Sequence, residues 1–261
     1  AQDAPNLEEV VVTAQRRSER LVDVPMSIAA MSGDDLVASG VRVLDLAESL
    51  HERGVSLRTV QEETDEHHEE EGEEHGEEHE HELEPGSTDP HLWLDPVLLI
   101  EASRLITDVL VALHPGEKDA YESRLQTLTT DLRALDTEYE QGLASCRVRT
   151  IVASHDAFGY LSDRYRFEVL PLAGISPQQE PSARRIGELA TLIRERGIGY
   201  VYFETLVSPK LAETLAREAG AQTLMLNPVE GLTADDRTAN HDYFSLMRQN
   251  LRALRTGMDC R

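Results

Sequence analysis

Four short apolar segments between residues 149 and 226 alternate with segments of helical periodicity, and this alternation constrains the fold more than any other feature. Strands separated by helices of about 10–15 residues are typical of a parallel sheet with right-handed crossovers. We therefore predict an α/β fold, a parallel sheet flanked by helices. The expected strands cover residues 149–154, 166–171, 200–204 and 222–226, and the expected helices cover residues 157–164, 182–196, 209–219 and 241–255.

Polar residues stand at the ends of three of these expected strands. Ser154 and His155 end the first strand, Glu204 ends the third, and Asn227 follows the fourth. Ligands of parallel α/β sheets bind at the carboxyl ends of the strands, where such residues meet along one edge. The sequence therefore predicts a binding site built from these side chains.

Two longer helices are expected ahead of the sheet. Residues 95–113 place apolar side chains at helical spacing, with Asp95-Pro96 suited to the cap and first turn. His114-Pro115-Gly116 interrupts this pattern, and residues 117–144 then form a long amphipathic segment. We expect linking and spine helices over residues 91–144 and a C-terminal α/β lobe over residues 145–261.

One segment carries most of the formal net charge of −24. Residues 61–90 hold 15 acidic side chains, no Lys or Arg, and five of the ten histidines. Such a segment buries too little apolar surface to offset its ordering entropy, so we expect a mobile loop. An acidic run alone indicates a solvated spacer, whereas histidine interleaved with glutamate favours capture of divalent metal. The loop histidines are His67, His68, His75, His79 and His81.

The composition also excludes two classes of protein. A strongly negative chain is poorly suited to binding nucleic acid or an anionic membrane surface. Because the sequence has no run of about 18 apolar residues, no membrane-spanning helix is expected.

The two cysteines and the first residues bear on the compartment. Cys146 and Cys260 lie far apart, so neither a zinc ribbon nor a thioredoxin-type motif is available. They are either two buried thiols or a disulfide, and a disulfide requires an oxidising compartment. The chain begins Ala-Gln-Asp-Ala-Pro, as expected after removal of a secretory signal, although a cytosolic chain could begin the same way.

From His91 to Cys260 the chain resembles the C-terminal lobe of metal-binding solute-binding proteins of ABC importers, and the zinc branch is the closer match. His91-Leu-Trp-Leu-Asp-Pro is similar to the family's central motif, and residues 154–160 resemble its second histidine motif. Phe203-Glu204 and Leu226-Asn227-Pro228 match further segments. The acidic His-rich loop is also typical of the zinc branch.

This resemblance implies a set of site residues. His91 and His155 are the implied Zn²⁺ ligands, and the manganese branch tends to have a carboxylate where His155 stands. Asn227 stands where a carboxylate ligand is common, and Glu204 either binds zinc directly or supports a ligating imidazole. The resemblance also implies a disulfide between Cys146 and Cys260.

The N-terminus resembles a different family. Residues 7–17, 23–28 and 32–36 are similar to the TonB box and the start of the plug of TonB-dependent outer-membrane receptors. We therefore expect a plug-like segment over residues 1–50 and a seam over residues 51–60. Within the segment, residues 7–14 form a β-branched run, and residues 24–36 suggest a strand leading into a capped helix. The resemblance to metal solute-binding proteins implies metal held between two lobes. Because the plug-like segment stands in place of the first lobe, the metal site is expected to be more open to water.

These observations lead to a preferred function and two alternatives. The preferred one is a periplasmic zinc-binding protein that performs no chemistry, captures zinc for an ABC importer and has an inner-membrane permease as partner. The first alternative is a TonB-docking or chimeric protein that acts as a metal buffer or chaperone without transport competence. A zinc hydrolase is disfavoured, because no His-Glu-x-x-His motif or comparable ligand set is present.

Overall fold

The computed structural model describes residues 11–12, 19–20, 44–60, 86–175, 181–205 and 208–261. The five loop histidines, and nearly all of the segment expected to resemble a receptor plug, lie outside these described residues. The chain divides into two units, Ala1–Leu44 with Glu230–Asn240, and Asp45–Val229 with His241–Arg261. The boundaries expected from the sequence stay predictions.

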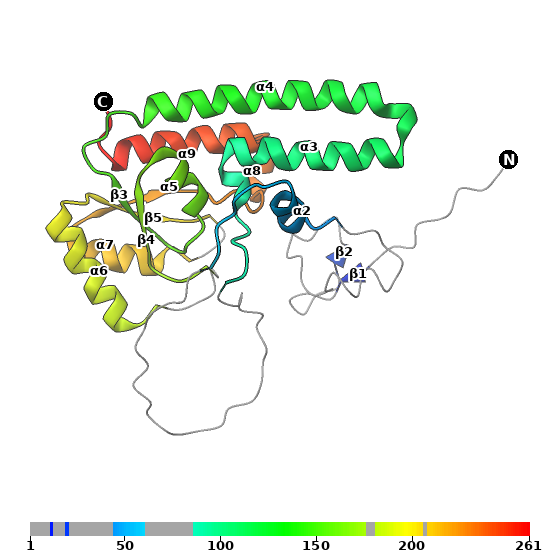
Figure 1. Ribbon diagram of the computed structural model, residues 1–261. Coiled ribbons are helices and arrows are strands. Elements are labelled where there is room, and N and C mark those ends of the chain that lie inside the picture. Colours follow the sequence, from blue (N-terminus) through cyan, green and yellow to red (C-terminus); the bar gives the residue numbers. More distant parts are fainter. Residues whose placement is uncertain (1–10, 13–18, 21–43, 61–85, 176–180, 206–207) are drawn as a thin grey trace. The chain divides into compact units, whose positions relative to one another are not determined.

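A four-stranded parallel sheet forms the centre of the larger unit, in the order β4-β3-β5-β6 (Figure 1). Thr150 pairs with Glu168 in the first strand pair, and Tyr200 pairs with Gln222 in the last. The α/β fold predicted from the sequence is therefore confirmed. The strands are β3 (Thr150–Ala153), β4 (Glu168–Pro171), β5 (Tyr200–Phe203) and β6 (Gln222–Met225).

Both faces of this sheet are buried under helices. Because successive side chains of a strand point to opposite faces, Ile151 and Tyr202 enter one core, and Val152 and Val201 enter the other. The first core is completed by α5, α9 and the end of α4, and the second by α6 and α7 (Figure 1). The flanking helices are α5 (Gly159–Tyr165), α6 (Ala183–Arg196), α7 (Lys210–Ala219) and α9 (Tyr243–Gly257).

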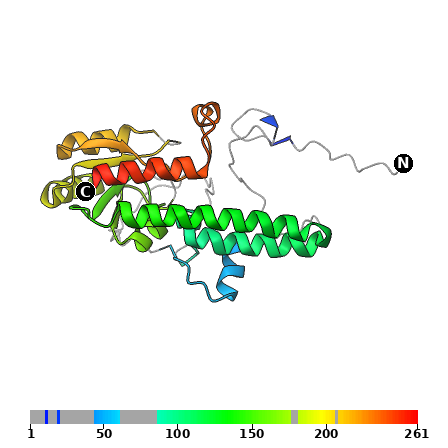
Figure 2. The ribbon, with the colours of Figure 1, turned by 90° about the horizontal axis from the view of Figure 1, so that it is seen from above.

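Two helices, α3 (Pro96–Leu113) and α4 (Lys118–Gly142), lie side by side in the same unit (Figure 2). The Asp95 carboxylate accepts hydrogen bonds from the first backbone N–H groups of α3, and Pro96 begins the helix, as predicted. The interruption at 114–116 becomes the 3₁₀ turn η2 (Pro115–Glu117). Among the described residues, no helix is both long and apolar enough to cross a membrane.

A short helix not predicted from the sequence precedes the acidic segment. Helix α2 (Leu46–Glu52) begins at Asp45, whose carboxylate caps Glu48 N–H at 2.9 Å. Its only fully buried residue, Leu50, belongs to the same apolar cluster as Leu105 of α3. Residues 46–50, assigned above to the plug-like segment, therefore form part of the larger unit.

The described residues of the smaller unit contain three short elements. Strands β1 (Val11–Val12) and β2 (Glu19–Arg20) pair antiparallel. Helix α8 (Ala234–Thr238) was not predicted, although Thr233 and Asp236 form a capping box at its start.

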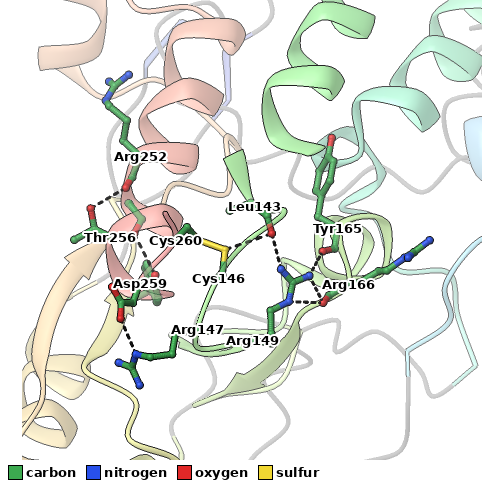
Figure 3. Close-up of a disulfide and its surroundings, with 12 residues drawn as sticks. Leu143, Cys146, Arg147, Arg149, Tyr165, Arg166, Arg252, Thr256, Asp259 and Cys260 are labelled. Carbon is green, nitrogen blue, oxygen red and sulfur yellow. Dashed lines mark hydrogen bonds and ion pairs between the residues drawn. A yellow bond between two sulfur atoms is a disulfide. The ribbon is translucent and has the colours of Figure 1, made fainter. Parts of the chain in front are cut away.

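A disulfide joins Cys146 to Cys260 and so ties the end of α9 to the segment before β3 (Figure 3). The disulfide implied by the resemblance is confirmed, and the alternative of two free thiols is wrong. Val148 N–H donates to Met258 O at 3.0 Å alongside the bridge, and Arg147 forms an ion pair with Asp259 at 2.6 Å. The bridge closes a loop across 114 positions of the chain, a span for which chain entropy predicts about 4–5 kcal/mol of stabilisation.

Candidate metal centre

His91 is a buried histidine held by a carboxylate two residues earlier in the chain. It caps the 3₁₀ helix η1 (Leu92–Leu94) and is 3% exposed. One oxygen of Asp89, Oδ1, accepts both the backbone N–H of His91 at 2.9 Å and Nδ1 at 2.8 Å. Because an ionised carboxylate only accepts hydrogen bonds, Nδ1 carries the proton and Nε2 has the lone pair.

His155 lies against a carboxylate that follows the neighbouring strand. His155 follows β3, Glu204 follows β5, and these two strands are neighbours in the sheet. Glu204 Oε1 accepts the backbone N–H of His155 at 3.1 Å, and Glu204 Oε2 lies 2.7 Å from Nδ1. The structure thus brings together two of the polar residues that the sequence assigned to this edge of the sheet.

The imidazole rings of His91 and His155 lie next to each other in an edge-to-face arrangement. Their ring centroids are 5.4 Å apart, with an angle of 63° between the rings. Two imidazoles that bind one zinc ion at about 2.0–2.1 Å with a tetrahedral angle have centroids about 5 Å apart. The separation of His91 and His155 therefore fits a shared divalent metal ion.

Glu204 and Asn227 have other contacts in the structure. Both carboxylate oxygens of Glu204 face His155, an arrangement suited to supporting that imidazole. The side-chain oxygen of Asn227 accepts the Val229 N–H at 2.8 Å, and its backbone exchanges two hydrogen bonds with the Asn250 amide. Asn227 therefore shapes the turn after β6.

Trp93 connects this turn to the segment that carries His91. Its indole N–H donates to Pro228 O at 2.8 Å, and its own carbonyl accepts the Tyr243 hydroxyl at 2.7 Å. The indole also lies edge-on to the His91 ring, at 5.4 Å between centroids. Residues far apart in sequence thus fix the surroundings of His91.

Two carboxylates at this centre were not predicted from the sequence. Asp89 precedes His91 by two residues in an Asp-Pro-His sequence, which was its only signal. Asp156 follows His155, and burial raises the pKa of its carboxyl, an effect opposed by the positive charge of Arg58 and by the two histidines.

The remaining described histidines lie elsewhere. His51 is exposed on α2, His114 is exposed at the end of α3, and His241 contacts the Gln249 amide.

Comparison with known proteins identifies the family. The family model described as "ZnuA: Zinc-uptake complex component A periplasmic" matches residues 27–257. The chain therefore belongs to this zinc-uptake family of solute-binding proteins. The match begins inside the segment expected to resemble a receptor plug, and the comparisons do not support the TonB box.

Two relatives show how much of the family's length is present. The chain is 42% identical to the zinc-binding lipoprotein AdcA of Streptococcus pneumoniae over 171 residues, which is 66% of this chain and 34% of the relative. It is 38% identical to the high-affinity zinc uptake system protein ZnuA of Bacillus subtilis over 170 residues, 65% of this chain and 53% of the relative. The chain thus spans between a third and just over half the length of these relatives.

A solved structure agrees with the fold. The crystal structure of the Zn(II)-bound ZnuA-like domain of Streptococcus pneumoniae AdcA matches with a TM-score of 0.59 and 40% identity. The match covers 68% of this chain and 66% of that one.

Proposed function

We propose that this chain binds Zn²⁺ reversibly and delivers it to the permease of an ABC zinc importer. The observation that carries the proposal is the pair of buried imidazoles, His91 and His155. In each, Nδ1 lies within 2.8 Å of a carboxylate oxygen. This arrangement fixes the tautomer and raises the basicity of Nε2, which is how proteins prepare histidine for a metal ion. Family membership supports zinc as the cargo.

No bond of a substrate is made or broken in this function. Imidazole nitrogen suits zinc better than it suits manganese or magnesium, which favour oxygen ligands. The carboxylates of Asp89 and Glu204 act by orienting His91 and His155, and we propose that Glu204 supports His155 rather than binding zinc directly. The family is a zinc-uptake component, so the hydrolase alternative has no support.

Zinc titration in competition with a chromophoric chelator tests the histidine pair. We expect His91→Ala and His155→Ala each to weaken binding by at least about 100-fold, because each removes a direct ligand. His114→Ala is the matched control, since His114 is exposed at the end of α3. Unchanged affinity in either site variant would contradict the proposal.

The five loop histidines, His67, His68, His75, His79 and His81, are proposed to collect zinc and raise its local concentration. Deleting residues 62–84 is expected to remove the zinc ions that bind weakly and to retain the one that binds tightly. Loss of tight zinc binding in the deletion variant would place the tight site in the loop.

Family membership and the relatives support an extracytoplasmic location, and we propose the periplasm as the compartment. Docking of residues 6–14 to TonB is a separate proposal. The comparisons do not support it. A pull-down with the C-terminal domain of TonB, lost when residues 6–14 are deleted, would establish it. No binding at high micromolar concentration would remove it.

A further inference from the structure

Arg58 lies next to Asp89, the carboxylate that holds His91. The guanidinium Nε of Arg58 is 3.5 Å from Asp89 Oδ2, and its Nη1 is 2.6 Å from Asp163 Oδ2 on α5. The Asp89 side chain is only 4% exposed, while that of Arg58 is 29% exposed. The two oxygens of Asp89 therefore face different partners, Oδ1 facing His91 and Oδ2 facing Arg58.

The backbone holds the same pair of residues together. Asp89 N–H donates to Arg58 O at 3.0 Å, next to the antiparallel bridge between Thr59 and Thr88. The Tyr160 hydroxyl accepts Arg58 N–H at 3.1 Å and donates to Asp89 O at 3.0 Å. Burial raises the pKa of Tyr160 to about 12, so this hydroxyl stays a donor at neutral pH.

Gly159 provides the space that the Arg58 side chain occupies. A Cβ added at Gly159 would overlap the Nε, Cζ and Nη2 atoms of the guanidinium, so any other residue there would displace them. Gly159 lies in the second histidine motif, four residues after His155. This motif therefore contributes a histidine to the centre and also the room for the cation beside Asp89.

We propose that Arg58, whose guanidinium packs against Gly159, is a positioning residue for the zinc centre. It acts through Asp89 on the orientation and tautomer of His91. The proposal rests on the proposed function for its effect on zinc, but its effect on His91 exists in the zinc-free protein as well.

The physical reason is the cost of burying a carboxylate. A buried carboxylate without a cationic partner turns toward water. Asp89 would then no longer hold Nδ1–H of His91, and the imidazole would be free to rotate or to exchange tautomers. With Arg58 in place, the Asp89 carboxylate stays fixed, and Nε2 stays directed at the metal position.

The experiment uses the full chain with histidine selectively labelled with ¹⁵N. Long-range ¹H–¹⁵N spectra of the zinc-free protein at pH 8 report which ring nitrogen of His91 carries the proton, and His91→Gln assigns the signals. The variants are Arg58→Met, Arg58→Lys and Gly159→Ala. The matched control is Arg53→Met, which removes an exposed arginine–aspartate pair with Asp108. Zinc affinity and the thermal unfolding midpoint are measured for each variant.

We expect His91 to be protonated at Nδ1 in the wild type and in Arg53→Met. Arg58→Met and Gly159→Ala should both lose this preference and weaken zinc binding about tenfold, within the range for residues that support a ligand. Arg58→Lys, which keeps the charge, should recover part of both effects.

A folded Arg58→Met or Gly159→Ala with the wild-type His91 tautomer would overturn the proposal, whatever its zinc affinity. If Arg58→Met fails to fold, Gly159→Ala decides, since it retains the arginine and only displaces it. If His91→Gln leaves zinc affinity unchanged while the Arg58 variants change the tautomer, the proposed zinc ligation fails and the positioning role of Arg58 stands.

Discussion

Asp89 holds His91 by two hydrogen bonds to a single carboxylate oxygen, one from the backbone N–H and one from Nδ1–H. The backbone hydrogen bond fixes the carboxylate relative to the main chain, and the second fixes the ring relative to the carboxylate. Glu204 contacts His155 with both oxygens: Oε1 accepts the backbone N–H, and Oε2 lies 2.7 Å from Nδ1. The imidazoles are thus oriented before any metal ion arrives, which reduces the ordering cost of binding.

Removing either supporting carboxylate is expected to weaken zinc binding without removing a ligand. We predict that Asp89→Ala and Glu204→Ala each lower zinc affinity by about 10–100-fold. Asp108→Ala, in an exposed pair with Arg53, serves as the control and should bind as the wild type does. Chelator competition measures all three, and a wild-type affinity in Glu204→Ala would show that His155 needs no support.

The disulfide is expected to stabilise the fold and to leave zinc binding unaffected. Reduction of Cys146–Cys260, or the double substitution to serine, should lower the free energy of unfolding by about 2–5 kcal/mol. Denaturant unfolding with and without reductant measures the difference. A reduced protein of unchanged stability would mean that the hydrogen bonds flanking the bridge suffice.

The pair formed by Asp136 and Arg164 is expected to make stability depend on acid pH. Burial alone would raise the pKa of Asp136, but hydrogen bonds from Arg164 and the Tyr165 hydroxyl outweigh burial and lower it. A carboxyl whose folded pKa is lowered contributes stability above its ordinary pKa and loses it as pH falls through the folded value.

Asp136→Asn should therefore destabilise the protein by about 1–3 kcal/mol at neutral pH. The difference from the wild type should shrink below about pH 4, near the ordinary pKa of aspartate. Urea unfolding at several pH values measures this. A difference that stays constant down to pH 2 would contradict the assignment.

Two glycines should respond oppositely to the same substitution. A Cβ at Gly257, near the end of α9, would overlap the Tyr202 hydroxyl, so Gly257→Ala should destabilise by about 1–3 kcal/mol. Gly187 lies exposed in α6 with open space around its Cα, so Gly187→Ala should stabilise by about 0.5–1 kcal/mol. Thermal unfolding distinguishes them, and equal shifts would contradict the tight packing at Tyr202.

Much of the fold follows from local sequence. The strands can be predicted from short apolar runs, and the starts of α3 and α6 from Asp95-Pro96 and Ser182. Periodicity and helix caps are properties of neighbouring residues, so they can be read from the sequence alone. Helix α2 was not predicted because its seven residues form too short a pattern, and its stability depends on burial of Leu50 in the cluster with α3.

The metal centre was only partly predictable, for a physical reason. His91 and His155 stand in recognisable motifs. Arg58 and Asp89, by contrast, are 31 positions apart in the sequence and come into contact only in the folded chain, and Asn250 of α9 contacts Asn227 after β6. Their roles depend on tertiary contacts that no local pattern carries.

The central claim is that His91 and His155 bind one zinc ion together. X-ray absorption at the zinc edge, on the chain lacking residues 62–84 and loaded with one equivalent, counts the imidazoles around the metal without interference from the loop. The account predicts two imidazole nitrogens at about 2.0 Å, with oxygen in the remaining positions. Histidine neighbours that persist unchanged after His91→Ala and His155→Ala together would contradict it.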